Sequence, residues 1–151
     1  MTDFARLMSD YFVKYLAGQK GSGSNTMKTY RDTFVQLLEF MDEKKHIRAD
    51  CIEVDSFSCD IINEFLEYLE KEKRVSISTR NNRLAAIRSF FKYTGYHEPK
   101  YLNISTSIRE ISKKKTEGRQ MNYLSVNAME HFLNSFDKTD HKELRCFCIV
   151  L

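Results

Sequence analysis

The sequence predicts an all-α protein: a bundle of four to five helices, then a polar linker and the start of a second helical part. One proline and five glycines in 151 residues leave few positions that break helices. Hydrophobic residues make up 42% of the chain and aromatic residues 13%, which is enough for a packed core. The apolar residues recur every three or four positions along most of the chain, as they do in amphipathic helices.

The first helix is predicted over residues 3–17, and the second begins after a glycine- and serine-rich break at residues 18–24. In the first helix the apolar residues at helical spacing are Phe4, Leu7, Met8, Tyr11, Tyr15 and Leu16. Ser24, Asn25 and Thr26 are candidate N-caps of the second helix. Its apolar stripe consists of Met27, Tyr30, Phe34, Leu37, Leu38 and Met41.

A connection over residues 46–57 leads to a third helix, which Ser58 or Asp60 is expected to cap. The apolar positions of this helix are Ile61, Ile62, Phe65, Leu66 and Leu69. Ser76, Ser78 and Thr79 open a fourth helix, and Gly95 is expected to close it as a C-terminal cap. A brief helix is predicted over residues 104–111.

Residues 113–119 are polar, basic and without periodicity, so they are predicted to be an interdomain linker. The expected division is a helical domain over residues 1–111, a linker over 112–122 and a second domain from 123 to 151. In this last part Ser125 is expected to cap a helix that reaches Phe136, and another helix begins at Glu143. The chain ends inside the apolar run FCIVL, so we expect it to be a fragment.

Charge is distributed unevenly along the chain. Residues 39–72 contain eleven acidic residues against four lysines or arginines. Residues 73–97 contain six basic residues and no acid, and residues 11–31 contain four basic residues and no acid. This segregation predicts a bundle with one positive face, as is typical of proteins that contact phosphate. Ordinary solvated helix faces are the alternative interpretation.

Metal, cofactor and membrane functions have no support in the sequence. The four cysteines form no CxxC pair and the four histidines are scattered, so neither a zinc site nor another cofactor is expected. There is no signal peptide and no apolar stretch long enough to span a bilayer. We therefore expect a cytoplasmic, reduced protein.

The fourth helix, ISTRNNRLAAIRSFFKY, is the most informative segment. Helical spacing predicts one core face with Ile77, Leu84, Ile87 and Phe91. The opposite face would present Thr79, Asn82, Arg83, Ala86, Ser89 and Tyr93. Small residues in the middle would let the helix approach a DNA major groove, and the polar ones would bond to base edges or phosphates. The alternative is an amphipathic helix whose solvent face lacks acids.

The run TRNNRLAAIRSFFKY, with FLEYLEKEK and NTMKTYRDTFVQLLEFM before it, resembles the core-binding domain of tyrosine recombinases, the phage-type integrases. The likeness is greatest to recombinases of transposons and integrative elements. The stretch YLSVNAMEHFLNSFD is similar to the start of the catalytic domain in that family. The resemblance implies a SAM-like bundle that closes over one side of double-stranded DNA, in a protein that acts as a tetramer.

The resemblance also implies that the second and fourth helices meet DNA and that the linker crosses its backbone. The candidate DNA-binding residues are Thr26, Lys28, Arg31, Ser78, Thr79, Asn82 and Arg83, and in the linker Lys113, Lys114, Lys115 and Arg119. Arg80 has two alternatives, a phosphate contact or an ion pair with a carboxylate of the acidic third helix.

In this family a tyrosine attacks a phosphodiester while arginines, a lysine and histidines stabilise the charge on the phosphate. None of these catalytic positions is assigned in this chain, including Arg145 and the eight tyrosines, so we expect the chain alone to be inactive. The rival interpretations are a non-enzymatic helical DNA-binding regulator and a protein-interaction bundle. The first helix could pack on its own core or dock on a neighbouring protomer.

Overall fold

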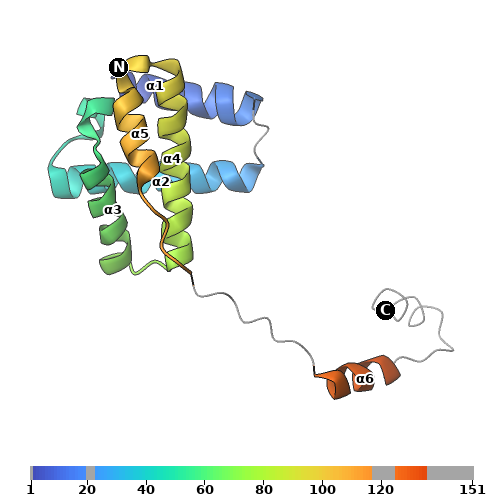
Figure 1. Ribbon diagram of the computed structural model, residues 1–151. Coiled ribbons are helices and arrows are strands. Elements are labelled where there is room, and N and C mark those ends of the chain that lie inside the picture. Colours follow the sequence, from blue (N-terminus) through green and yellow to red (C-terminus); the bar gives the residue numbers. More distant parts are fainter. Residues whose placement is uncertain (1, 20–22, 117–124, 136–151) are drawn as a thin grey trace. The chain divides into compact units, whose positions relative to one another are not determined.

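The computed structural model describes residues 2–19, 23–116 and 125–135 (Figure 1). These residues form helices and loops, with no strand among them, so the prediction of an all-α fold is confirmed. Two compact units divide the chain, Met1–Thr116 and Glu117–Leu151. The first unit is a helical bundle.

The first helical segment has two parts, the α-helix α1 (Asp3–Asp10) and the π-helix η1 (Tyr11–Gln19). Its buried side chains follow one another at intervals of three, four and five residues: Phe4, Leu7, Tyr11 and Leu16. The last interval is longer than an α-helical turn and matches the wider turn of a π-helix. As a result Leu16 is fully buried, whereas Tyr15 is only partly buried.

Helix α2 (Ser24–Lys45) begins directly after Gly23, which is its N-cap. The prediction of a cap within residues 24–26 is therefore wrong, because these residues already lie in the first turn. The helix ends at His46, whose φ of 55° is the left-handed conformation that terminates many helices. One stripe of α2 is buried against the rest of the bundle: Thr33, Phe34, Leu37, Phe40 and Met41.

The connection between α2 and the next helix belongs to the core and is not an open loop. It contains two short 3-10 helices, η2 (Ala49–Cys51) and η3 (Val54–Ser56). Ile52, Val54 and Phe57 of this connection are buried. Helix α3 (Cys59–Lys71) follows, and its N-cap is Ser58, one of the two residues expected there.

Helix α4 (Ile77–His97) is central, with contacts to α2, α3 and α5, and Ser76 caps its N-terminus. Because three helices surround it, buried residues lie on several of its sides: Arg80, Leu84, Ala86, Ile87, Phe90, Phe91, Tyr93 and Thr94. The prediction that Ala86 and Tyr93 face outward is therefore wrong, and Ile77, expected in the core, is 40% exposed. Apart from Ile77 and His97 at the two ends of α4, its exposed residues follow one narrow stripe of Ser78, Asn82, Lys92 and Tyr96.

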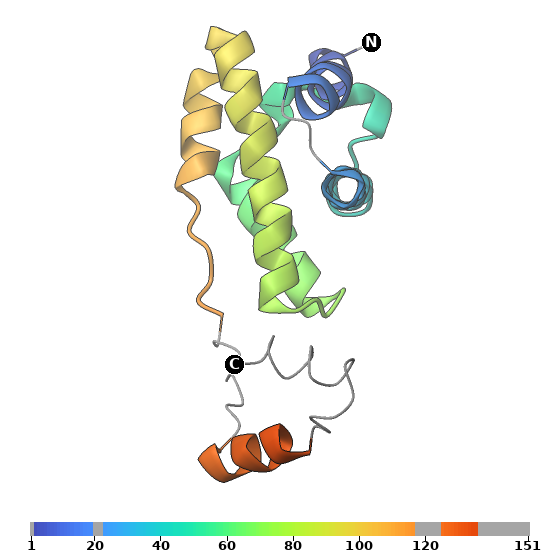
Figure 2. The same cartoon turned by 90° about the vertical axis from the view of Figure 1, so that its right-hand side faces the viewer.

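Helix α5 (Leu102–Glu110) follows the 3-10 helix η4 (Pro99–Tyr101) and packs beside α4 (Figure 2). The predicted C-cap at Gly95 is wrong, because α4 continues to His97. A Cβ at position 95 would lie 2.7 Å from Oγ and 2.8 Å from Cβ of Ser105. At Gly95 the two helices α4 and α5 thus approach too closely for a side chain on α4.

The first helical segment packs on the core of its own bundle. The ring of Tyr11 lies 5.4 Å from the rings of Phe90 and Tyr93, and its hydroxyl donates to Oγ of Ser89 at 2.9 Å. Burial raises the pKa of this phenol. Of the two alternatives for the segment, the structure shows packing on its own core, with its aromatic stripe already covered.

The second unit contains helix α6 (Val126–Asn134). Its N-cap is Ser125, as expected, and the Ser125 hydroxyl accepts a hydrogen bond from the Ala128 N–H at 3.2 Å. Phe136 and the helix expected from Glu143 lie outside the described residues. None of the helices in the described part of the chain has the length and apolar character needed to cross a membrane.

Replacing Gly95 by alanine is expected to lower the free energy of unfolding by about 1–3 kcal/mol, because the added methyl group forces α4 and α5 apart. Urea unfolding of Gly95→Ala measures the loss. Gly18→Ala is the matched control, since this glycine also lies inside a helix and the nearest atom to a Cβ there is the Val13 main-chain oxygen at 3.8 Å. Ser105→Gly should partly restore stability in the Gly95→Ala background, and purely additive effects of the two changes would contradict this account.

Candidate nucleic-acid interface

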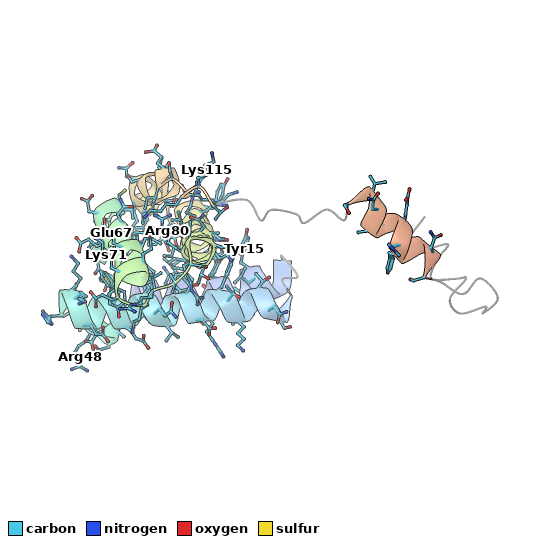
Figure 3. The ribbon with its side chains drawn as sticks, turned by 90° about the horizontal axis from the view of Figure 1, so that it is seen from below. Tyr15, Arg48, Glu67, Lys71, Arg80 and Lys115 are labelled. Atoms are coloured by element: carbon cyan, nitrogen blue, oxygen red, sulfur yellow. The ribbon has the colours of Figure 1, made fainter. Side chains whose placement is uncertain are left out.

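Lysines and arginines on one side of the bundle are neutralised by neighbouring carboxylates. This acidic side comprises the C-terminal half of α2, the connection after it and α3. Its ion pairs are Lys44–Glu72 at 2.8 Å, Lys45–Glu64 at 2.5 Å, Arg48–Asp50 at 3.1 Å and Lys71–Glu67 at 2.7 Å. Hydrogen bonds to their carboxylate partners raise the pKa of Lys44 and Lys71. In Figure 3 Arg48, Glu67 and Lys71 lie on the opposite side of the bundle from Tyr15.

Other cations have no carboxylate partner among the described residues. They are exposed or partly buried side chains of α2, α4, α5 and the segment after α5: Lys28, Arg31, Arg88, Lys92, Arg109, Lys113 and Lys115. Because no local carboxylate compensates these charges, their field extends into solvent. Lys73 and Arg74 after α3 are also exposed without a carboxylate partner among the described residues, and Lys14 of η1 pairs with Asp10 at 2.7 Å. Unpaired cations thus gather around α4 and α5 but are not confined to them.

A polar groove of about 280 Å³ runs between the N-terminal half of α2 and α4. This α2–α4 groove is lined by Asn25, Thr26, Thr29, Tyr30, Asn82 and Ala85. It brings together Thr26 and Asn82, two of the predicted DNA-binding residues. The Asn82 amide is exposed and has no hydrogen-bond partner within the described part of the chain. Its donor and acceptor are thus both free to bind another molecule.

A second groove, of about 310 Å³, adjoins the first at Ala85. This basic groove is lined by Tyr15, Ala85, Arg88, Ser89, Lys92, Arg109 and Lys113. Four of these side chains are cations, from α4, from α5 and from the segment after α5. Arg88 also donates a hydrogen bond to the main-chain oxygen of Arg109, which ties α4 to the end of α5.

The sequence alone did not single out Lys92, Arg109 or Tyr15 as site residues. For Lys92 a signal existed, since it lies in the acid-free stretch of residues 73–97 and four positions after Arg88. Arg109 and Tyr15 had none, because only the packing of α5 and η1 beside α4 brings them to this groove.

The side chain of Arg83 on α4 bonds to helix α2. Its Nη1 donates to the Thr29 carbonyl oxygen at 2.9 Å and to Oγ1 of Thr33 at 3.1 Å. Thr33 is completely buried, so this arginine reaches inward beneath the α2–α4 groove. In this placement the guanidinium holds α2 against α4, and the DNA contact expected of Arg83 stays a prediction.

Arg80 is buried, with 7% of its side chain exposed. Its Nε lies 3.1 Å from Oε1 of Glu70 on α3, and its Nη1 donates to Oδ1 of Asn81 at 3.2 Å. Of the two alternatives for Arg80, the structure has the ion pair with the acidic third helix. In this conformation its guanidinium is not on the surface where a phosphate would bind.

The remaining predicted residues are spread over several places. Lys28 and Arg31 line a separate recess of α2 with Phe12, Ser24 and Met27, and no residue of that recess lines the α2–α4 groove. Ser78 is exposed at the start of α4, whereas the Thr79 hydroxyl lies 3.0 Å from Oγ of Ser76 in the helix cap.

The predicted DNA-binding cations of the linker also differ in their surroundings. Lys113 and Lys115 are exposed and have no partner among the described residues, whereas Nζ of Lys114 lies 2.7 Å from Oε2 of Glu70. Arg119 lies outside the described residues. Within the parts of the chain that the structure covers, no group of three or more His, Cys, Asp or Glu side chains is placed to hold a metal ion.

Residues 10–99, more than half of the chain, match the family of phage integrase N-terminal SAM-like domains. The chain therefore belongs to this family of core-binding domains. No solved structure matches it.

The relatives of the chain include recombinases. It is 32% identical over 111 residues to the Sinorhizobium fredii protein named "Putative integrase/recombinase y4rD", covering 74% of this chain and 40% of that protein. It is 28% identical over 135 residues to "Putative integrase/recombinase y4rC" of the same organism, covering 89% and 41%. It is 28% identical over 145 residues to the tyrosine recombinase XerD of Vibrio vulnificus, covering 96% and 44%. The chain thus spans about two fifths of the length of these relatives.

If Arg80 is a structural residue, Arg80→Leu should lower the free energy of unfolding by about 2 kcal/mol, since it leaves Glu70 without its buried partner. The loss stays moderate because Glu70 retains Lys114. Thermal and urea unfolding measure it. Arg31→Leu, the same change at an exposed arginine, should leave stability nearly unchanged. An unaltered unfolding midpoint for Arg80→Leu together with weaker DNA binding would instead assign Arg80 to phosphate contact.

Proposed function

We propose that this chain is the DNA-binding portion of a tyrosine recombinase and that it clamps duplex DNA at recombination sites for strand exchange and integration. The observation that carries the proposal is the gathering of unpaired cations around the open stripe of α4. Membership in the phage integrase SAM-like family and the recombinase relatives support it. The chain spans two fifths of those relatives, so the activity of a whole protein is part of the proposal.

In this proposal the α2–α4 groove faces the bases. Asn82 offers an amide that pairs with an adenine edge in the major groove, and Thr26 offers a hydroxyl from the facing helix. Ala85 between them has only a methyl group, which lets the helix approach closely. Arg88, Lys92 and Arg109 in the adjoining basic groove bind phosphates on the flanking backbone.

Cleavage and assembly fall to other parts of such a recombinase. Strand exchange needs a nucleophilic tyrosine with arginines and histidines around the phosphate. We propose that this chain alone binds DNA without cutting it, and that a complete recombinase assembles as a tetramer on two duplexes in the cytoplasm. Residues 123–151 would then be the first part of a catalytic domain.

A compact helix-turn-helix regulator is the second interpretation, and the topology disfavours it. That motif joins its two helices by a short turn of three or four residues. Here α3, η2 and η3 all lie between α2 and α4 in the chain. A bundle that binds only other proteins would not need cations without carboxylate partners beside an open polar groove.

Binding to random duplex DNA is expected to weaken steeply as salt rises, because each phosphate contact releases counterions. The double variant Lys92→Gln/Arg109→Gln should lower the affinity and reduce the slope of log K against log salt by about 2. Lys44→Gln/Lys71→Gln removes the same charge from the acidic side and should leave the slope unchanged. Fluorescence anisotropy at several salt concentrations measures both. Equal effects of the two double variants would reject the assignment of the interface.

Incubation with a pool of nicked suicide duplexes should give no covalent adduct of this chain that survives a denaturing gel. The reason is that, in this proposal, the nucleophilic tyrosine and the arginines and histidines that activate it belong to other parts of a complete recombinase. A complete tyrosine recombinase on its own nicked site is the positive control. A phosphotyrosyl adduct of this chain would contradict the proposal that it is inactive by itself.

A further inference from the structure

The segment that leaves the bundle after α5 is held against α4 by a side chain. This strap, residues 112–116, runs along the N-terminal half of α4 in the views of Figures 1 and 2. Nδ2 of Asn81 donates to the main-chain oxygen of Lys114 at 2.8 Å. The main-chain N–H of Lys114 donates to Oδ1 of Asn81 at 3.1 Å. Both main-chain groups of one residue are therefore bound by one amide, as a neighbouring strand would bind them.

The side chain of Arg80 fixes the orientation of the Asn81 amide. Arg80 Nη1 donates to Oδ1 of Asn81 at 3.2 Å, so this atom must be the oxygen and Nδ2 must face the Lys114 carbonyl. Arg80 is in turn paired with Glu70, and its Nη1 also lies 3.4 Å from the main-chain oxygen of Ser112. Figure 3 shows Arg80 between α3 and α4. The buried pair thus orients the amide that holds the strap.

Because the strap is attached in this way, its three lysines have different surroundings. The Lys114 ammonium lies 2.7 Å from Oε2 of Glu70, with half of its side chain exposed, so Lys114 has a carboxylate partner that it shares with Arg80. In an extended segment neighbouring side chains point the opposite way. Lys113 accordingly lines the basic groove with Arg88 and Lys92, and Lys115 is exposed without a partner among the described residues.

We propose that Asn81 is a positioning residue that fixes the strap on α4, so that Lys113 and Lys115 bind DNA phosphate as part of the bundle surface while Lys114 does not. The inference rests on the proposed DNA-binding function and names which strap cations serve it. A free tether would lose backbone conformational entropy at each residue when it bound phosphate. A strap that is already ordered loses less, so the attachment strengthens binding without touching DNA.

The attachment is tested without DNA by amide hydrogen exchange measured by NMR. Exchange of the Lys114 amide should become at least about fivefold faster in Asn81→Ala, because that N–H loses its acceptor. Asn81→Asp keeps the acceptor but loses the donor to the Lys114 carbonyl, so it should give an intermediate rate. Asn82→Ala, the same truncation at the neighbouring exposed asparagine, should leave the rate unchanged. A Lys114 amide that exchanges as fast in the wild-type chain as in Asn81→Ala would overturn the inference.

The sorting of the lysines is tested by single variants with the same loss of charge. Lys113→Gln and Lys115→Gln should each reduce the salt slope of DNA binding by about 0.9, the value for one phosphate contact. Lys114→Gln should leave the slope unchanged. Asn81→Ala should weaken binding about three- to tenfold while keeping most of the slope, since the lysines remain but are no longer ordered.

The outcomes separate this inference from the proposed function. If the wild-type chain does not bind DNA at all, the proposed function fails, whatever the exchange data show. If it binds with a steep salt slope but all three lysine variants lose the same slope, DNA binding stands and the positioning by Asn81 is wrong. Unfolding curves of Asn81→Ala exclude a trivial loss of fold, which is not expected because Asn81 is only partly buried.

Discussion

The burial of α4 among three other helices constrains the rest of this structure. Helices α2, α3 and α5 all contact it, and Gly95 allows α5 to lie so close that no side chain fits between them. Between the two ends of α4 only one narrow stripe remains open, from Ser78 through Asn82 and Lys92 to Tyr96. Any ligand of this helix must therefore bind along that stripe, and the residues that flank it come from α2 on one side and α5 on the other.

The cations of this central helix have two kinds of surroundings. Arg80 and Arg83 point into the bundle, where one meets Glu70 and the other meets Thr29 and Thr33. Both arginines fix neighbouring helices, because a planar guanidinium bonds several acceptors in set directions. Arg88 and Lys92 extend from the open stripe and have no carboxylate partner among the described residues. The positive surface is therefore built from cations that have no carboxylate partner, although Arg88 also bonds to the main chain of α5.

The sequence predicted the fold class and most helices, because the periodicity of apolar residues reports burial on one face. The prediction was wrong at positions where burial is not confined to one face of a helix. Ala86 and Tyr93 were expected outside, but a helix surrounded by three others has no simple outer half. Gly95 read as a helix end, since its true role depends on Ser105, ten positions further along the chain. The π-helical turn before Leu16 likewise leaves no mark in a search for the ordinary helical period.

The sequence predicted which helices carry the candidate site, but not which of their residues share a groove. Asn82 and Thr26 do share a groove, whereas Lys28 and Arg31 line another recess of α2. Whether a lysine is paired depends on contacts across helices. Lys114 illustrates this, since it lies between Lys113 and Lys115 in the sequence and is the one of the three that meets Glu70. For the acidic third helix the sequence offered one contact with the basic fourth, an ion pair to Arg80, and the structure adds a second contact, to the strap. Through Glu70 the helix pairs with one strap lysine and holds the arginine that orients Asn81, so its charge shapes the cationic surface beside it.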